Sequence, residues 1–453
     1  MLKLSFLGEV WDAVYAEITR AHPVEEGAFL LGRAVGTAHG ARVIVDRAVD
    51  PPDRDKWRLQ NEGQLAPTSE YMSRTAGLAD NSARIPVFVH SHPFGPANFS
   101  LTDDWAHEAW APFFVENVQQ AAFISVVVAG RDLAADMWIG GARFPFDVVT
   151  CAGADPRRSV RKVAEYSVHS GMEAAYSRQE ILWKRRGQFL LANSRVGIIG
   201  LGGTGSSAAV QLGRAGVGEL VLIDPDGSDM SNLNRLYCLE VEQARERLAK
   251  VFVVSRGLSQ IAATTCVAIQ RDVRESIVQP ELLECDVILG CTDSQSSRAH
   301  LNQVALVNGI PYVDAGCRAE SSGAEIISMW ADVRRVVSGG PCLFCMDVIS
   351  SDVIAAEGLP SETHRLAERD GYVLGSGLEP SVIVMTTTAA AIATSQVLGL
   401  LTNQDLTVDY QTLFDLWSGS VHRTQAKRRL DCICSSRRWV VENEPVNILV
   451  DKL

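Results

Sequence analysis

A glycine-rich segment between two short apolar runs is the feature that most constrains how this 453-residue chain can fold. The first run, Val196–Ile199, is typical of a strand buried on both faces, and the second, Leu220–Ile223, ends at Asp224. Between them a helical pattern covers Ser206–Ala215. The turn before that helix contains Gly200, Gly202, Gly203 and Gly205. This order predicts the first strand–helix–strand unit of a Rossmann-like, nucleotide-binding sheet, because glycines let phosphates approach backbone N–H groups and the helix N-terminus.

The residues after the turn favour ATP over other nucleotides. Asp224 lies about 20 residues past the turn, where an acid can hold ribose hydroxyls of NAD, FAD, S-adenosylmethionine or ATP. Arg235 and Lys250, with a helical stretch expected between them, add two cations near the phosphates. Asp293 follows the apolar run Val287–Leu289, at the sheet edge where ligands bind. Two cations and a carboxylate able to hold Mg²⁺ suit attack on an α-phosphate, although each residue alone also fits a surface or capping role.

A second motif, far upstream, has the composition of a catalytic metal site. The predicted strand Ile85–Val89 leads into His90 and His92, which alternate along the chain and therefore project to the same side. Asp103 begins a predicted helix and can supply a third ligand. Three such ligands leave one tetrahedral position for water, which zinc activates by lowering its pKa to about 7.

A zinc hydrolase also needs a group that takes and returns a proton. Glu25 and Glu26 are the candidates from the sequence, and Ser100 can donate to the oxyanion of a tetrahedral intermediate. The spacing of the histidines, Ser100 and Asp103 resembles that of the JAMM/MPN (JAB) metalloproteases over about residues 1–145. That resemblance implies a mixed-sheet peptidase that trims ubiquitin-like proteins or removes them from adducts. It also places the general acid/base on Glu25, although Ala28 stands where many members of the family carry glycine.

The glycine-turn region resembles the adenylating domain of ubiquitin-activating enzymes and of ThiF/MoeB-type sulfur-carrier activating enzymes, over about Glu173–Cys434. The resemblance implies that the C-terminal glycine of a ubiquitin-like protein is joined to AMP with release of pyrophosphate. Arg178 would reach ATP from the partner subunit of a homodimer, and Asp224 would bind the ribose. The phosphates and Mg²⁺ would be contacted by Asn232, Arg235, Lys250 and Asp293.

Two pairs of cysteines match the position where the adenylating family holds a structural zinc. They are Cys342 with Cys345, and Cys432 with Cys434. Four thiolates make a closed tetrahedral site, although the second pair is Cys-x-Cys where the family has Cys-x-x-Cys, and buried free thiols are the alternative. Residues 349–379 contain no cysteine, so a thioester relay from that loop is not expected, and Cys317 is the nearest substitute.

Composition bounds the remaining expectations. A net charge of −12 argues against a general nucleic-acid or anionic-membrane partner. The N-terminus does not resemble a signal peptide, and the apolar run Val382–Leu401 contains enough polar residues to predict a buried helix, so we expect a cytoplasmic protein. We expect a peptidase domain over residues 1–150 and a linker with a helix over 151–172, beginning with the polar segment Cys151–Arg161. The adenylation domain would cover 173–436, and a tail without a motif 437–453.

Together these features predict an α/β protein that fuses a zinc peptidase to an adenylating enzyme. Both would act on one ubiquitin-like protein, with a conjugating enzyme as a further partner. Such fusions resemble components of bacterial ubiquitin-like operons, which implies a role in phage defence. One alternative is an activating enzyme for a sulfur carrier in cofactor or metabolite synthesis, and another is a nicotinamide-dependent oxidoreductase.

Overall fold

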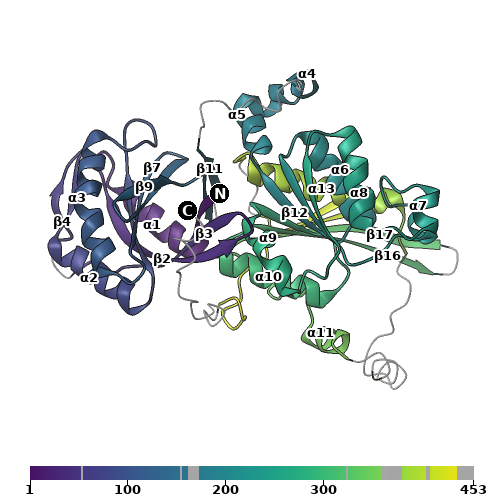
Figure 1. The fold of residues 1–453 in the computed structure, drawn as a ribbon. Helices are drawn as coiled ribbons and strands as arrows, with labels where there is room; N and C mark the ends of the chain where they lie inside the picture. The colour runs from purple at the N-terminus through teal and green to yellow at the C-terminus, as the bar shows by residue number, and fades with distance from the viewer. Residues whose placement is uncertain are drawn as a thin grey trace. The chain divides into compact units, whose positions relative to one another are not determined.

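The computed structural model of the protein describes residues 1–52, 55–153, 156–161, 173–322, 325–359, 363, 380–404 and 409–435. The expected tail over 437–453 and residues 162–172 of the expected linker with a helix lie outside these residues. The described residues form two compact units, residues 1–161 and residues 173–435, each with the gaps given above (Figure 1).

The first unit is built on a mixed sheet whose strands run in the order β11-β10-β1-β3-β2-β6-β7-β8-β9. The strands are β1 Leu2–Leu7, β2 Gly27–Thr37, β3 Gly40–Ala48, β6 Ile85–Ser91, β7 Ala122–Ala129, β8 Asp132–Ile139, β9 Ala142–Pro145, β10 Val148–Ala152 and β11 Arg157–Val160. A separate hairpin pairs β4 Trp57–Gln60 with β5 Leu65–Pro67. The strand predicted over Ile85–Val89 is therefore confirmed as β6.

Helices cover both faces of this sheet. Helix α1 (Gly8–Arg20) packs on one face, in a core that includes Trp11 and the odd-numbered β6 residues Val87 and Val89. Helices α2 (Ser69–Asn81) and α3 (Leu101–Asn117) pack on the other face, against Phe88 of the same strand. The alternation along β6 therefore directs His90, which shares the face of Phe88, toward α3.

The segment Cys151–Arg161 is not a linker, and that prediction was wrong. Its residues complete β10 and form β11, which pair antiparallel at the edge of the sheet. Arg157 is buried because its guanidinium lies 4.0 Å from the ring centroid of Tyr15 and donates to the carbonyl of Gly130. These partners come from distant parts of the chain, so the local composition gave no sign of them.

The second unit contains a sheet in the order β14-β13-β12-β15-β16-β17-β18-β19. The strands are β12 Arg195–Ile199, β13 Glu219–Ile223, β14 Thr265–Ile269, β15 Val287–Gly290, β16 Tyr312–Ser322, β17 Glu325–Val336, β18 Gln411–Asp415 and β19 Ser420–Thr424. The strands β14, β13, β12, β15 and β16 run parallel, and β17, β18 and β19 continue the sheet as antiparallel strands. Strand β12 has β13 on one side and β15 on the other, which makes its carboxyl end the switch point where such sheets bind ligands.

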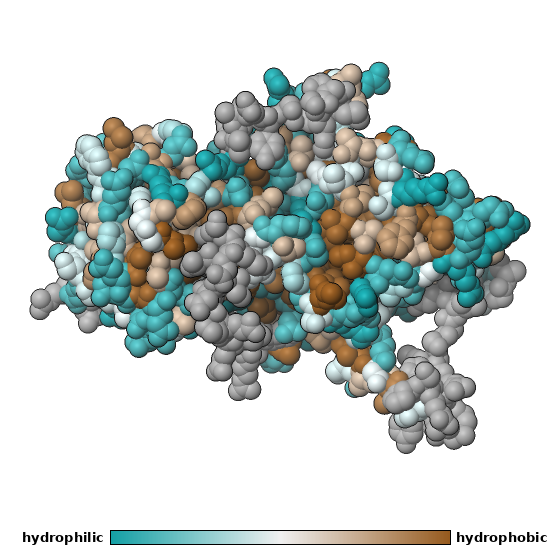
Figure 2. Space-filling view, in the orientation of Figure 1, coloured by the Kyte–Doolittle hydropathy of each residue, from teal (hydrophilic) through white to brown (hydrophobic). Residues whose placement is uncertain are grey.

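Helices α6 (Gly203–Ala215), α8 (Lys250–Ile261) and α13 (Ile383–Leu401) cover one face of this sheet, and α9 (Gln279–Glu284) and α10 (Gln295–Asn308) cover the other (Figure 1). Helix α13 is long and apolar enough to cross a membrane by length and composition, but half of its apolar window is buried. It packs against α6, β15, β16 and β17, as expected for a core helix. On the face shown in Figure 2, apolar surface occurs in several patches among polar side chains.

Shorter helices complete the unit. They are α4 (Glu173–Tyr176), α5 (Glu180–Ala192), η1 (Met230–Asn232), α7 (Val241–Arg245), η2 (Ser276–Val278) and α11 (Ser351–Glu357). The helical stretch expected between Arg235 and Lys250 was largely wrong, because only α7 forms there and Lys250 begins α8 instead of ending a helix. Ala249 forms a β-bridge with Gly227 and Arg247 has a positive φ of 54°, so tertiary pairing interrupts a sequence with good helix propensity.

Candidate functional site

Three predicted metal ligands converge at the end of β6 in the first unit. His90 Nε2 lies 3.2 Å from Asp103 Oδ1, His92 Nε2 lies 3.2 Å from Asp103 Oδ2, and the two nitrogens are 3.2 Å apart. Ligands about 2.0–2.1 Å from a tetrahedral zinc ion would be about 3.4 Å apart, so the set fits that ion with little movement. His90 is buried and His92 half-buried, which leaves one side open to solvent.

The two candidate proton-transfer residues have different surroundings. Glu25 is buried with Oε1 3.9 Å from His92 Nε2, beside the ligand cluster but outside it. Burial raises the pKa of Glu25 to about 7. His92 opposes this rise, and the charge of Asp103 adds to it. Glu26 instead accepts hydrogen bonds from Trp57 Nε1 at 2.8 Å and from its neighbour's backbone, and it pairs with Lys56. The geometry therefore favours Glu25 for proton transfer and gives Glu26 a structural role.

Ser100 has a role that the sequence analysis missed. It is the N-cap of α3, where its Oγ accepts from the Asp103 backbone N–H at 3.1 Å and its own N–H donates to Asp103 Oδ2 at 2.7 Å. This capping box fixes the carboxylate that faces both histidines. The Ser-x-x-Asp spacing before the helix was the signal that could have revealed it.

In the second unit, a cavity of about 960 Å³ opens at the carboxyl ends of β13, β12 and β15. Its volume is at the upper end of the roughly 300–1,000 Å³ typical of small-molecule sites. Predicted residues that line it are Gly200, Gly202, Gly203, Asp224, Asn232, Arg235, Lys250 and Asp293. Two other predicted residues of the nucleotide site do not line the cavity. Gly205 packs behind the turn, and Arg178 is exposed.

The glycines of the turn serve separate purposes. Gly200 has a positive φ of 86°, which favours glycine. A Cβ at Gly205 would lie 1.9 Å from the Gly200 carbonyl oxygen, so this position allows helix α6 to approach the strand end. A Cβ at Gly202 would meet nothing within 4 Å, because this residue faces the open cavity.

Backbone N–H groups hold Asp224 in the cavity, and an ion pair holds Lys250. Asp224 is buried and accepts from the backbone N–H groups of Leu201 at 2.6 Å and Asp226 at 2.8 Å. Burial raises the pKa of Asp224, against the opposing charge of Lys250, whose Nζ lies 3.9 Å away. Lys250 itself forms its close ion pair with Asp226, at 2.7 Å.

The remaining phosphate candidates are positioned by local hydrogen bonds. Asn232 Oδ1 accepts from the backbone N–H of Asp229, and Arg235 Nη1 donates to the carbonyl of Ser231 at 2.7 Å. Asp293 is exposed at the end of β15. These side chains and the turn surround one polar volume large enough for a nucleotide.

Comparison with known families follows this division of the chain. Residues 176–435, more than half of the chain, match the ThiF family. The chain belongs to the ThiF family. Residues 8–139 match the family described as prokaryotic homologs of the JAB domain. The fusion and the fold class predicted from the sequence are thereby confirmed, and we call the two parts the JAB domain and the ThiF domain.

Individual relatives match only part of this chain. The adenylyltransferase and sulfurtransferase uba4 of Ogataea parapolymorpha is 30% identical over 255 residues, 54% of this chain and 57% of that protein. The sulfur carrier protein ThiS adenylyltransferase of Escherichia coli is 33% identical over 151 residues, 31% of this chain and 56% of that protein. The chain thus spans about half the length of the curated relatives it matches. Escherichia coli MccB has 20% sequence identity and a TM-score of 0.47, covering 58% of this chain and 72% of MccB.

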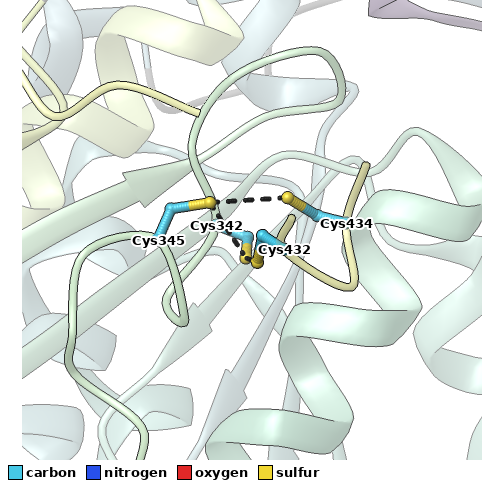
Figure 3. Close-up of side chains that lie close together, drawn as sticks. All are labelled: Cys342, Cys345, Cys432 and Cys434. Atoms are coloured by element: carbon cyan, nitrogen blue, oxygen red, sulfur yellow. Dashed lines mark hydrogen bonds between the residues drawn. The ribbon is translucent and has the colours of Figure 1, made fainter. Parts of the chain in front are cut away.

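The four predicted cysteine ligands of the ThiF domain lie together. Cys342 and Cys345 come from the loop after β17, and Cys432 and Cys434 from the segment after β19 (Figure 3). Their Sγ atoms are 3.8 Å apart for Cys342–Cys345, 3.6 Å for Cys342–Cys432 and 3.5 Å for Cys345–Cys434. Bonds of about 2.3 Å to a tetrahedral zinc ion would place the sulfurs about 3.8 Å apart, so these three distances fit such a site. All four are free thiols, with no disulfide between them.

Cys317, the substitute nucleophile considered from the sequence, lines the cavity of the ThiF domain on β16. Its Sγ donates to the carbonyl of Met385 at 3.5 Å and lies 3.9 Å from Thr204 Oγ1. Burial raises the pKa of this thiol to about 11, which disfavours the thiolate.

Sequence analysis also missed five arginines that line the cavity, which are Arg271, Arg274, Arg298, Arg318 and Arg334. Arg298 lies in the first turn of α10, the helix that follows β15. The first turns of helices in parallel sheets point toward the ligand-binding edge, so its position was a usable signal. Arg334 is near the end of a strand in an antiparallel hairpin, where the sequence offered none.

Proposed function

We propose that this chain is a bifunctional enzyme that acts on one small ubiquitin-like protein. In this proposal the ThiF domain adenylates the protein's C-terminal glycine with ATP, and the JAB domain trims the precursor or cleaves conjugates. The observation that carries the proposal is the convergence of the cations, Asp293 and the glycine turn on one cavity in a ThiF domain. The printed activities of the relatives, adenylyltransferases, support the same reaction class.

The adenylation step needs positioning and charge stabilisation more than covalent catalysis. A carboxylate oxygen of the acceptor bonds to the α-phosphorus, and the bond from that phosphorus to the bridging oxygen breaks, so pyrophosphate leaves. Asp224 would hold the ribose, while Asn232, Arg235 and Lys250 would neutralise the leaving phosphates. Asp293 would hold the Mg²⁺ that accompanies ATP. Arg178 would complete the site from the partner of a homodimer, which accounts for its absence from the cavity of its own domain.

In the JAB domain, His90, His92 and Asp103 would hold a catalytic zinc ion, which supplies a water activated at neutral pH. Glu25 would take the proton of that water and return it to the leaving amine. Ser100 would donate its hydroxyl hydrogen to the oxyanion while its Oγ continues to accept from Asp103. The cysteines Cys342, Cys345, Cys432 and Cys434 would hold a second, structural zinc ion.

ATP–pyrophosphate exchange that depends on an added ubiquitin-like protein tests the adenylation. Candidate proteins ending in glycine and encoded beside this chain are the substrates to supply. Exchange should require Arg235 and Asp293, and exchange that survives Arg235→Ala and Asp293→Ala would remove the site assignment. Metal analysis tests the zinc sites: two zinc ions per chain are expected, with one lost in His92→Ala and the other in Cys342→Ser.

An activating enzyme for a sulfur carrier is the second candidate, because the ThiS adenylyltransferase is among the relatives. Its product would be a thiocarboxylate on the carrier, whereas a conjugation pathway, including the proposed phage defence, would yield an amide-linked adduct. Mass spectrometry of the carrier after reaction with ATP and a sulfur donor separates the two outcomes.

A further inference from the structure

Two buried nitrogen atoms beside the metal ligands of the JAB domain have no hydrogen-bond partner among the described residues. They are Nδ1 of His90 and Nδ1 of His107, and each histidine is only 1% exposed. Buried polar atoms in folded proteins are hydrogen-bonded in the great majority of cases, so two exceptions in one place need an explanation. The proposed roles of the zinc ligands, Glu25 and Ser100 make no use of His107.

The two nitrogens belong to neighbouring rings. The ring centroids of His90 and His107 are 5.9 Å apart, with an angle of 62° between the ring planes. His107 lies on α3 four residues after Asp103, and residues four apart share one face of a helix. Because the carboxylate of Asp103 faces His90, the same face of α3 brings His107 beside that ligand as well.

The other ring neighbours of His107 are aromatic. Its ring centroid lies 5.4 Å from that of Phe99, 5.7 Å from Trp110, 6.1 Å from Phe88 and 6.2 Å from Phe123. Burial of an imidazole among such rings costs stability unless its nitrogens are hydrogen-bonded, and burial of an imidazolium costs more. An apolar side chain would suit these surroundings better, so a histidine here indicates a polar role.

Binding of zinc would give His90 Nδ1 a hydrogen that needs an acceptor. Nε2 of His90 faces Asp103 and His92, so Nε2 is the nitrogen that would ligate the metal. A neutral imidazole that ligates through one ring nitrogen carries its hydrogen on the other. Metal-ligating histidines almost always donate that hydrogen to a neighbouring acceptor, which fixes the ring and raises the basicity of the ligand. Nδ1 of a neutral His107 is such an acceptor when its own hydrogen is on Nε2.

We propose that His107 is a positioning residue for the zinc site, whose Nδ1 accepts a hydrogen bond from Nδ1–H of the ligand His90. Directly bonded imidazoles, with about 2.9 Å between their nitrogens, have ring centroids about 5 Å apart. A movement of about 1 Å, or one bridging water, therefore completes the bond from the observed separation of 5.9 Å. This inference rests on the proposed zinc site and adds a residue that contacts neither the metal nor the substrate.

The affinity of the site for zinc tests the proposal without a substrate. The zinc-loaded full chain is titrated with a chelator whose fluorescence reports the zinc that it takes up, and the release step that is absent in His92→Ala belongs to the JAB site. His107→Leu removes the acceptor and should weaken zinc binding in this step about 10–100-fold, as loss of such a partner typically does. His107→Gln, whose amide oxygen can accept the same hydrogen, should stay within about threefold of the unmodified protein.

Phe123→Leu is the matched control, because Phe123 is buried beside the same ring but offers no hydrogen-bond acceptor. It should keep the zinc affinity of the JAB site within about twofold of the unmodified protein. If His107→Leu does not fold, His107→Met takes its place, since methionine adapts to irregular spaces in a core and should show the same loss of affinity.

Three results would overturn the assignment of His107: an unchanged zinc affinity in His107→Leu, an equal loss in His107→Gln, or an equal loss in Phe123→Leu. Either of the last two would show that packing, and not the hydrogen bond, supports the ligand. Absence of the release step from the unmodified protein has a different meaning. That result would refute the proposed zinc site, and the role of His107 with it.

Discussion

Two glycines of the same turn should respond differently to substitution by alanine. Alanine at Gly205 would place its Cβ 1.9 Å from the carbonyl oxygen of Gly200, far inside contact distance and against backbone that cannot rotate away. Alanine normally stabilises a helix interior by about 0.5–1 kcal/mol relative to glycine, but overpacking costs typically about 1–3 kcal/mol, and more when backbone must move. The steric cost is the larger, so Gly205→Ala should be destabilising.

Gly202→Ala is the matched control, since its Cβ would meet no atom within 4 Å and the residue has a negative φ of −72°. It should leave the free energy of unfolding almost unchanged and instead weaken ATP binding, because the methyl group projects into the cavity. For a domain of this size each kcal/mol corresponds to roughly 2–4 °C in Tm. Gly205→Ala should therefore lower the Tm of the ThiF domain by about 4 °C or more.

Differential scanning calorimetry and titration with Mg²⁺–ATP measure the two effects separately. The steric argument would be refuted if Gly205→Ala melted at the temperature of the unmodified protein. It would also be refuted if Gly202→Ala lost as much stability as Gly205→Ala while keeping its affinity for ATP.

Three further predictions concern single side chains. Glu25→Gln should lower the kcat of the proposed peptidase about 100-fold or more with zinc retained, whereas Glu26→Gln should lower kcat less than about tenfold. Equal losses of kcat in the two variants would contradict the assignment of Glu25. Cys317→Ser should leave the rate of ATP–pyrophosphate exchange within about twofold of the unmodified protein, because a thiol with a pKa of about 11 is a poor nucleophile at neutral pH. A thioester that this substitution abolishes would show instead that Cys317 is a nucleophile. Asp226→Asn should tighten ATP binding by up to about fivefold, because it frees Lys250 from a solvent-exposed ion pair worth about 1 kcal/mol at most. An equal gain in affinity in a Lys250→Met background would show that this ion pair is not responsible.

The fold around the glycine turn could be predicted because every level of its sequence agrees. Apolar runs define β12 and β13, the glycines define the turn, and the intervening periodicity defines α6. The segment after Arg235 lacks this agreement. Its composition favours a helix, but Ser228 N donates to the carbonyl of Leu248 at 2.7 Å and pulls the chain into a bridge. Long-range backbone pairing of this kind leaves no local trace.

In the candidate sites, too, residues fixed by local sequence could be predicted and residues fixed by distant contacts could not. His90, His92 and Asp103 were predictable because a strand end and a helix start fix their directions. The choice between Glu25 and Glu26 could not be made from their positions alone, since both are acids in the same loop. It depends on Trp57, which comes from a distant hairpin and holds Glu26 away from the metal ligands.

The two proposed activities are related through the chemistry of one carboxyl group. In this proposal the JAB site would act on an amide carbonyl and release a free carboxylate, whereas the ThiF cavity would require a free carboxylate and convert it into a mixed anhydride with AMP. A C-terminus that is still extended or conjugated has no carboxylate with which to attack the α-phosphate. Hydrolysis must therefore precede adenylation for any given molecule, whatever the arrangement of the two domains. A precursor carrying residues after the glycine should support ATP–pyrophosphate exchange only when Glu25 and the zinc ligands are intact, while the trimmed form should support it in a Glu25→Gln variant as well.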